Sequence, residues 1–257
     1  VEVAAGASDN AAAAIGTGII AGASCNISLG TSGTMFIPAY EFKVDPNNAL
    51  HSFAHADGYY HLMACMLSAA SCNKWWMEDV LTKDYTKEQP NFDKLGFNEV
   101  FFLPYLMGER SPHNDTRARA AFIGMSMNTK REDMTQAVME GVLFGLRDSL
   151  EVAKKLGISF EKTTLCGGGA KSKLWRQMSA DIMKLEVDLV ETEEGPAYGA
   201  AILAGVACKE FESVKSACKA LIKVKEHISV NKEAAKRYDE KYERFTKLYP
   251  ALKGLFC

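Results

Sequence analysis

In the first part of the chain, apolar residues occur in short runs or alternate with polar ones. In the second part, they recur every three or four positions. Short apolar or alternating runs, bounded by Gly, Pro, Asn or Asp, predict strands. Asp57-Gly58 separates two of these runs, which is a strong hairpin signal. The predicted strands are Val1–Ala5, Cys25–Leu29, Met35–Ile37, His51–Ala56, Tyr59–Met66, Ala121–Met125, Thr163–Cys166 and Val187–Val190, and Val100–Leu103 is a further short apolar run.

Apolar residues spaced three and four apart predict helices, most of them in the second half. The longest is expected to start at a capping box, Thr129-Lys-Arg-Glu132, and to end at Gly157. Gly141 and Gly145 on it would let another backbone approach closely. The other predicted helices are Ala11–Ile20, Ser68–Leu81, Ser172–Ile182, Ala197–Ala207, Phe211–Ile222 and Lys232–Tyr249.

The order of these elements predicts the fold class. Hairpins come first, and strands then alternate with helices, which fits an α/β domain whose mixed sheet is flanked by helices. Thr82–Asn98 is polar and is expected at the surface, and Glu193-Glu-Gly-Pro196 is expected to form a turn.

Composition narrows the class of protein without identifying it. The 257 residues carry a formal net charge of −2, so no nucleic-acid partner is indicated. No apolar run reaches the roughly 20 residues of a bilayer-spanning helix, and we find no signal peptide. The start at Val1 gives the expectation of an excised domain.

The seven cysteines and five histidines show no metal-ligand spacing, and no Cys-x-x-Cys pair occurs. We therefore expect reduced thiols in a cytoplasmic protein, with no zinc site and no disulfide framework. His113 lies in a polar loop with Glu109, Arg110 and Asp115. That loop suits either a functional role or a structural ion-pair network.

The sequence Leu165-Cys-Gly-Gly-Gly-Ala-Lys-Ser172 carries the clearest chemical signal. A strand leads through three glycines into a helix that Ser172 can cap. This arrangement offers backbone N–H groups and a helix start to a nucleotide or another anion. The alternative is a tight turn that binds nothing. The Walker A pattern fails at Ala170, and the dinucleotide fingerprint lacks its third glycine.

A second turn, Gly30-Thr-Ser-Gly-Thr34, offers backbone and hydroxyl donors to phosphate oxygens, although an ordinary hairpin loop fits as well. Asp9 is a lone carboxylate after the first predicted strand. Two glycine turns and an acid are what phosphoryl transfer needs, because the turns hold the nucleotide and the acid accepts the proton of an attacking hydroxyl.

Five motifs give the chain a resemblance to a known family. They are Gly6-Ala-Ser-Asp-Asn10, Ser28-Leu-Gly-Thr-Ser-Gly-Thr34, Phe102-Leu-Pro-Tyr-Leu-Met-Gly-Glu-Arg-Ser-Pro-His-Asn-Asp115, Gly167-Gly-Gly-Ala-Lys-Ser-Lys-Leu-Trp-Arg-Gln177 and Glu194-Gly-Pro-Ala-Tyr-Gly-Ala-Ala201. In this order they resemble the FGGY carbohydrate kinases over almost the whole chain. The resemblance implies a ribonuclease-H-like, actin-like ATPase domain. It covers the family's second, C-terminal domain, so the N-terminal sugar-binding domain is expected to be absent from residues 1–257.

The resemblance also implies roles for individual residues. Asp9 matches the catalytic base, and Asn10 beside it would contact the sugar. The other matched residues would bind the nucleotide. They are Gly30, Thr31 and Ser32 at the β- and γ-phosphates, and Gly168, Gly169, Ala170 and Lys173 at the adenosine, Lys173 by position only. A side chain introduced at Gly169 would then fill the space of the adenosine.

The implied reaction is ATP-dependent phosphorylation of a ketopentose, D-xylulose, to D-xylulose 5-phosphate. Mg²⁺ would bridge the phosphates, with help from an acid of the missing domain and from Asp9 through water. The partners would be ATP, the sugar and the missing domain, with a homodimer as a further interaction. An isolated second domain would turn over little sugar, because alignment of the reactants supplies much of the rate.

Three other interpretations stay open at this point. A kinase for another ketose or polyol differs mainly in sugar contacts outside this chain. An actin-like or chaperone-like switch would consume ATP without sugar. A non-catalytic binding or oligomerisation module would use the Tyr and Phe face of the last predicted helix and would bind no nucleotide.

Overall fold

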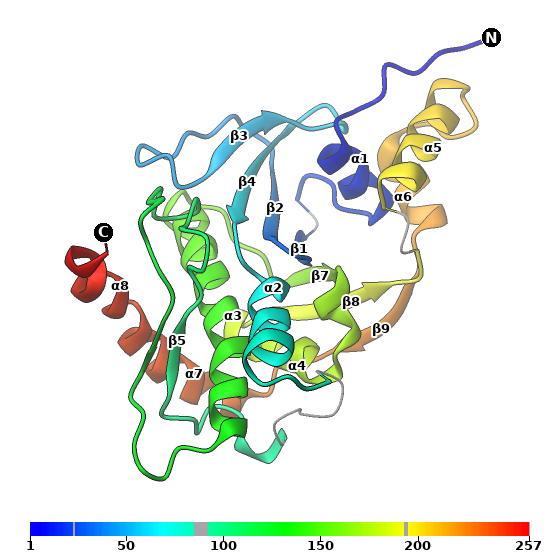
Figure 1. The fold of residues 1–257 in the computed structure, drawn as a ribbon. Coiled ribbons are helices and arrows are strands. Elements are labelled where there is room, and N and C mark those ends of the chain that lie inside the picture. Colours follow the sequence, from blue (N-terminus) through cyan, green and yellow to red (C-terminus); the bar gives the residue numbers. More distant parts are fainter. Residues whose placement is uncertain (23, 85–91, 193–194, 257) are drawn as a thin grey trace.

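A seven-stranded mixed sheet forms the centre of the computed structural model, which describes residues 1–22, 24–84, 92–192 and 195–256 (Figure 1). The strand order is β3-β4-β2-β1-β7-β8-β9. Pairing is parallel between β1 and β7 and between β7 and β8, and antiparallel elsewhere in this sheet. The strands are β1 (Cys25–Leu29), β2 (Gly33–Ala39), β3 (His51–Ala54), β4 (Tyr60–Met66), β7 (Lys162–Cys166), β8 (Glu186–Val190) and β9 (Val224–Ile228).

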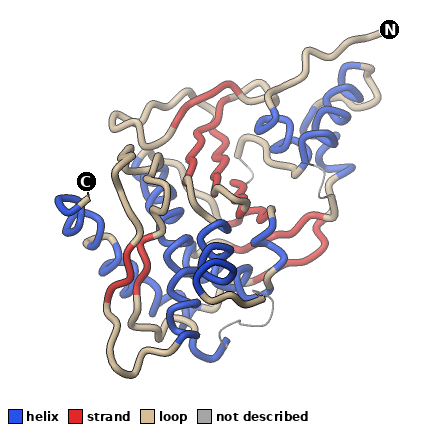
Figure 2. Tube along the Cα trace, in the orientation of Figure 1, coloured by secondary structure: helices blue, strands red, loops and turns tan. Residues whose placement is uncertain are grey.

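Helices cover both faces of the sheet, and a two-stranded sheet of β5 (Phe101–Leu103) and β6 (Ala121–Ile123) packs beside α3 (Figures 1 and 2). One face carries α3 (Arg131–Lys155), α4 (Lys173–Met183) and α7 (Lys232–Phe245). The other carries α1 (Asp9–Gly16), which packs against α5 (Gly195–Ala207) and α6 (Val214–Leu221). The remaining helices are α2 (Ala70–Lys74), which continues as a π-helix over Trp75–Val80, and α8 (Leu248–Leu252).

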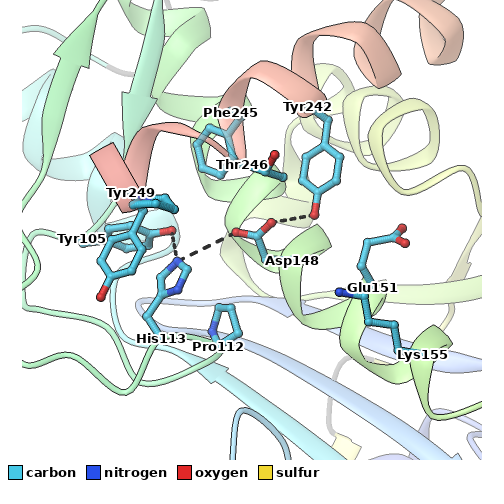
Figure 3. A pocket seen from close by; sticks show the side chains of 11 residues that line it. Tyr105, Pro112, His113, Asp148, Glu151, Lys155, Tyr242, Phe245, Thr246 and Tyr249 are labelled. Carbon is cyan, nitrogen blue, oxygen red and sulfur yellow. Dashed lines mark hydrogen bonds and ion pairs between the residues drawn. The ribbon is translucent and has the colours of Figure 1, made fainter. Parts of the chain in front are cut away.

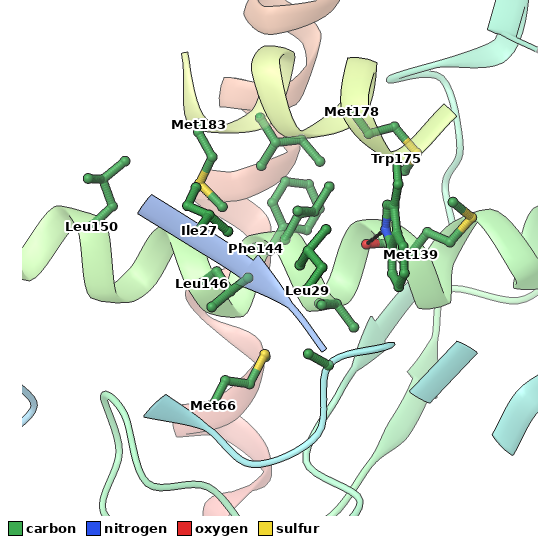
Figure 4. Close-up of a cluster of buried hydrophobic side chains, with 14 of the residues drawn as sticks. Ile27, Leu29, Met66, Met139, Phe144, Leu146, Leu150, Trp175, Met178 and Met183 are labelled. Atoms are coloured by element: carbon green, nitrogen blue, oxygen red, sulfur yellow. Dashed lines mark hydrogen bonds between the residues drawn. The ribbon is translucent and has the colours of Figure 1, made fainter. Parts of the chain in front are cut away.

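Because side chains alternate along the strands, one face of the sheet is apolar and the other carries polar groups. In β1, Ile27 and Leu29 point into the large core against α3 and α4 (Figure 4). Asn26 and Ser28 point to the opposite face, where Asn26 Nδ2 donates to Thr164 Oγ1 at 2.8 Å. The α3 face therefore holds the main hydrophobic core, and the α1 face holds a polar row.

The structure confirms the predicted fold class and most predicted elements. Among the details, Ser172 Oγ accepts the Trp175 N–H at 3.3 Å and caps α4, as expected. Close backbone approach at Gly141 is also confirmed, because a Cβ there would collide with the Phe102 carbonyl oxygen. The seven residues from 85 to 91, inside the predicted surface segment, and residues 193 and 194 of the predicted turn lie outside the described residues.

Four sequence predictions were wrong. Residues 1–8 form no strand, because no neighbouring strand lies beside them to complete their hydrogen bonds. Thr129 does not cap α3; the Asp133 carboxylate accepts the Lys130 N–H at 2.9 Å, so the helix begins at Arg131. The strand β9 was missed, because its burial pattern is almost wholly exposed and gives no alternation.

The fourth error concerns the alternative of an oligomerisation module, which supposed that the aromatic face of the last helix is exposed. Tyr238, Tyr242 and Phe245 are buried, and Phe144 of α3 lies against all three rings. This face belongs to the core of the domain, so it offers no support for an oligomerisation module.

Two further findings concern membrane-spanning helices and the cysteines. None of the helices in the described ranges combines the length and the apolar character that a membrane span requires. The six cysteines within those ranges are free thiols.

Candidate functional site

The two glycine turns lie side by side. Parallel pairing aligns Ser28 of β1 with Cys166 of β7, so both strands end at the same edge of the sheet. Gly167, with φ +87°, then passes so close to β1 that a Cβ on it would lie 2.7 Å from the Leu29 carbonyl carbon and 2.9 Å from the Gly30 nitrogen. Only a residue without a side chain permits this approach. The fold thus joins two motifs that are far apart in the sequence.

The first turn, residues 30–32, is fixed by the start of α2. The Gly30 carbonyl accepts the Ala70 N–H at 2.9 Å, and the Thr31 carbonyl accepts the Ala69 N–H at 2.9 Å and the Ser71 hydroxyl at 2.8 Å. In a trans peptide the N–H points opposite to the carbonyl. The N–H groups of Thr31 and Ser32 therefore point away from α2, in the manner of an anion-binding backbone nest.

The second turn divides its residues between the core and the surface. Gly168–Lys171 forms a 3₁₀ turn. Gly169 and Ala170 are buried, and a Cβ at Gly169 would lie 2.6 Å from the Trp175 ring. Gly168 is exposed, with open space where a Cβ would project, and Lys173 is exposed at the first turn of α4. Of these residues, Gly168 and Lys173 are the ones that a ligand can reach.

Asp9 and Asn10 start α1 and are both exposed. Asn10 lines a cavity of about 100 Å³ between α1 and the polar face of the sheet, and its Nδ2 lies 3.6 Å from Met63 Sδ. Ser28 and Cys166, which lead into the two glycine turns, line the same cavity. The remaining lining residues are Ala13, Ala14, Asn26, Thr34 and Phe36. The first turn of α1 thus faces the strand ends that carry both turns.

A second and larger cavity lies on the α3 side of the sheet, with a volume of about 360 Å³ (Figure 3). Its polar groups are bonded to one another: the Tyr242 hydroxyl donates to Asp148 at 2.6 Å, and the Tyr105 hydroxyl lies 2.8 Å from His113 Nε2. Burial raises the pKa of Asp148 to about 7 and lowers that of His113 to about 4. None of the nine candidate site residues lines it. We assign no ligand to it.

Within the described residues, no ion pair joins Glu109, Arg110, His113 and Asp115 of the polar loop to one another, although Asp115 pairs with Arg117 at 3.9 Å and His113 Nε2 lies 4.0 Å from Asp148 Oδ2. Asp115 accepts the Tyr249 hydroxyl at 2.8 Å, and Tyr249 stacks on His113. Glu109 is buried and accepts two backbone N–H groups. No sequence pattern indicates that this loop, or α2, supports the first glycine turn, because that support runs through hydrogen bonds to backbone groups distant in the chain.

In the described part of the chain, no three His, Cys, Asp or Glu side chains cluster so that they could hold a metal ion. Magnesium in nucleotide sites usually takes one or two carboxylates together with substrate phosphates and water. Asp9 is an exposed carboxylate at the start of α1, and a single accessible carboxylate of this kind is chemically suited to such a site.

A mixed α/β domain whose adjacent parallel strands end in glycine turns is typical of proteins that bind phosphate groups. The chain belongs to the FGGY family of carbohydrate kinases: residues 25–208 match the model of the family's C-terminal domain. This confirms the family resemblance seen in the sequence.

Relatives and solved structures extend the comparison beyond that range. The chain is 36% identical to a xylulose kinase of Staphylococcus epidermidis over 260 residues and 38% identical to that of Escherichia coli over 264 residues. These alignments cover 99% and 100% of this chain but 52% and 54% of the relatives. The chain therefore spans about half the length of these curated relatives.

The fold agrees with crystal structures of the same class. A xyloylose kinase from Brucella ovis superposes with a TM-score of 0.89 at 34% identity, over 96% of this chain and 51% of that one. A xylulose kinase from Bifidobacterium adolescentis gives a TM-score of 0.76 at 31% identity, over 93% and 47%. The predicted fold class is thus confirmed at the level of the family.

Proposed function

We propose that this chain is the nucleotide-binding half of an ATP-dependent sugar kinase that converts D-xylulose to D-xylulose 5-phosphate. The observation that carries this proposal is the meeting of the two glycine turns beside the first turn of α1. The family match and the similarity to xylulose kinases support the choice of reaction and sugar.

The two turns would divide the nucleotide between them. Thr31 and Ser32 direct their N–H groups away from α2 and would bind the β- and γ-phosphates, with Gly30 giving the turn its shape. The adenosine would lie over Gly168 and Lys173, which are exposed. Gly169 and Ala170 would not contact the adenosine, and would instead hold the turn in place by packing it against Trp175 and Leu29.

Asp9 would act as the general base. As the terminal hydroxyl of the sugar attacks the γ-phosphorus, its proton passes to the Asp9 carboxylate, the new O–P bond forms, and the bond to the β-phosphate oxygen breaks to release ADP. Asn10, one residue further along α1, would hold a sugar hydroxyl. Mg²⁺, when bound by the phosphates, would neutralise their charge, and Asp9 is the carboxylate suited to contact its water.

The chain would work together with a second domain. The relatives are about twice as long, and the matched region is their C-terminal domain. Most sugar contacts and a further acidic group for Mg²⁺ would come from the other half. Residues 1–257 would then bind nucleotide but phosphorylate sugar slowly, because the acceptor is not held in line.

Two other functions make different predictions. A kinase for another ketose or a polyol would have the same nucleotide site and would differ in the accepted sugar. A nucleotide-dependent switch would hydrolyse ATP without sugar. Assays of a protein containing both halves, with ATP and each candidate sugar, would separate these possibilities.

Thermal unfolding of the 257-residue chain with and without Mg-ADP tests the central claim. A ligand at about 100 times its Kd stabilises the folded state by roughly 2.7 kcal/mol, which is a measurable shift in Tm. We expect such a shift with Mg-ADP and little added effect of D-xylulose. The absence of any shift with Mg-ADP would reject the nucleotide site in this chain.

A further inference from the structure

Glu109 is bonded to the segment that leads from β4 into α2, and the first residues of α2 are in turn bonded to the turn of residues 30–32. Its side chain is buried, and Oε1 accepts the Leu67 N–H at 3.0 Å and the Arg110 N–H at 2.7 Å. Leu67 follows β4 directly and stands three residues before the start of α2. The carboxylate therefore fixes the segment from which α2 begins.

Ser111 holds the same segment from the neighbouring position. Its Oγ accepts the Cys65 N–H at 3.1 Å, and its own N–H donates to the Cys65 carbonyl at 3.1 Å. A pair of backbone hydrogen bonds between Glu109 and Asp115, at 2.9 and 2.8 Å, closes the loop that carries both residues. The end of β4 is thus held at two points by one closed loop.

From this segment the hydrogen bonds continue into the glycine turn. Ala69, two residues after Leu67, donates to the Thr31 carbonyl at 2.9 Å, and Ser71 adds its hydroxyl at 2.8 Å. The orientation of the Thr31 carbonyl sets that of the Ser32 N–H, because both belong to one peptide plane. A continuous series of short contacts therefore joins Glu109 to the donors that face the ligand.

We propose that Glu109 is a positioning residue, which orients the phosphate-binding N–H groups of the 30–32 turn through Leu67 and the first turn of α2. The inference rests on the proposed nucleotide function. It adds a residue that lines neither the cavity beside Asn10 nor the larger cavity on the α3 side.

The state of the second carboxylate oxygen agrees with this role. Glu109 Oε2 is buried and has no hydrogen-bond partner within the described residues, and the hydroxyl of Ser68, the residue after Leu67, is in the same state. A buried polar atom without a partner destabilises the folded state. Glu109 is thus poorly suited to a purely stabilising role, and its clear contribution is the segment that it holds.

The test compares ligands with and without phosphates on variants of the 257-residue chain. Isothermal titration gives Kd for Mg-ADP and for adenosine in the wild type, Glu109→Ala, Glu109→Gln and Ser71→Ala. Glu109→Ala should weaken Mg-ADP about tenfold and leave adenosine within about twofold. Glu109→Gln keeps an acceptor for Leu67 and should restore Mg-ADP affinity to within about threefold. Ser71→Ala should weaken Mg-ADP by about three- to fivefold.

Glu140 provides a matched control, because its carboxylate is as buried as that of Glu109. Its partners are Gln136, Tyr238 and Lys241, none of which belongs to the 30–32 turn, to α2 or to the segment that precedes α2. Glu140→Gln should lower Tm and leave both Kd values unchanged. Equal weakening of adenosine and Mg-ADP in Glu109→Ala, or unchanged Mg-ADP affinity, would overturn the proposal.

Two further outcomes are decisive. If Glu109→Ala does not fold, an unchanged Mg-ADP affinity in Ser71→Ala would overturn the proposal, because Ser71 is the last contact in the series. If the folded wild type binds neither Mg-ADP nor adenosine, the proposed function itself fails, and the positioning role fails with it.

Discussion

The two faces of the central sheet differ in what they contain, although the same strands build both. The α3 face is a continuous apolar core that buries the side chains of Leu29 and Leu146 (Figure 4) and that of Leu165. The α1 face carries Asn26, Ser28 and Cys166 around a cavity, and its apolar cluster is small. Alternation along each strand lets one face stabilise the domain while the other keeps polar groups available for ligands.

The largest expected effect concerns chemistry on the α1 face. In a protein that joins this chain to a sugar-binding half, Asp9→Asn should lower kcat by roughly 10²–10⁴-fold, the range for loss of a general base. The Kd for Mg-ADP should change little, since the amide keeps the shape of the side chain. Steady-state kinetics and titration measure the two quantities. Glu2→Gln, at another exposed acid near the N-terminus, is the control. A kcat within a few-fold of the wild type would exclude Asp9 as the base.

Two adjacent residues of β7 give the sharpest test of the difference between the faces. Leu165 is buried in the core, and Cys166 faces the cavity. Leu165→Ala should reduce the free energy of unfolding by about 2–5 kcal/mol, because it removes buried apolar atoms and leaves a void. Cys166→Ala should cost about 1 kcal/mol or less. Urea denaturation measures both. Equal losses would mean that the α1 face contributes to stability as the core does.

The second glycine turn contains a similar pair. A Cβ at Gly169 would lie 2.6 Å from Trp175 and 2.8 Å from the Leu29 Cβ, whereas the space at Gly168 is open. Gly169→Ala should destabilise the fold by about 1–3 kcal/mol, as overpacking does. Gly168→Val should leave Tm nearly unchanged and weaken adenosine binding. This reverses the sequence-based expectation, in which Gly169 bordered the adenosine. Normal stability of Gly169→Ala together with lost affinity would restore that expectation.

The contrast between these glycines shows how far the sequence could lead. Glycine spacing and the apolar period predicted the turn, the capping residue Ser172 and the helix after it, because these depend on neighbours in the chain. Whether a glycine faces a ligand or a tryptophan depends on the packing of α4 against the sheet, which no local pattern encodes. The strand β9 was missed for a related reason, since an exposed edge strand has no apolar alternation.

The candidate site likewise contains some residues that the sequence could indicate and others that it could not. Asp9, Asn10 and both glycine turns could be picked out by residue type and family resemblance, and the parallel pairing of β1 with β7 then explains why the two turns meet. Glu109 was noticed only as one charge in a polar loop. One of its hydrogen bonds is accepted from the Leu67 N–H, 42 residues earlier in the chain, and such a contact leaves no trace in residue spacing.

The most gradual of the expected effects is a pH dependence that Glu109 adds to stability. Burial raises its pKa from 4.5 to about 8 in the folded protein. Between these values the folded state holds a proton that the unfolded state has released, so the free energy of unfolding falls as pH rises from about 5 to 8 and levels off above. The slope from one such group is at most about 1.4 kcal/mol per pH unit.

Glu109→Gln cannot ionise, so the variant should lack this slope, and its stability relative to the wild type should increase steadily from pH 5 to 8. Denaturation curves at several pH values measure the difference, in which the contributions of other titrating groups cancel. Glu99→Gln, at a carboxylate whose side chain is 74% exposed, should give no such trend. Parallel curves for the wild type and Glu109→Gln would show that Glu109 is ionised in the folded protein. Its hydrogen bonds to Leu67 and Arg110 would then be charge-assisted at all of these pH values, and loss of the side chain should weaken Mg-ADP more than tenfold.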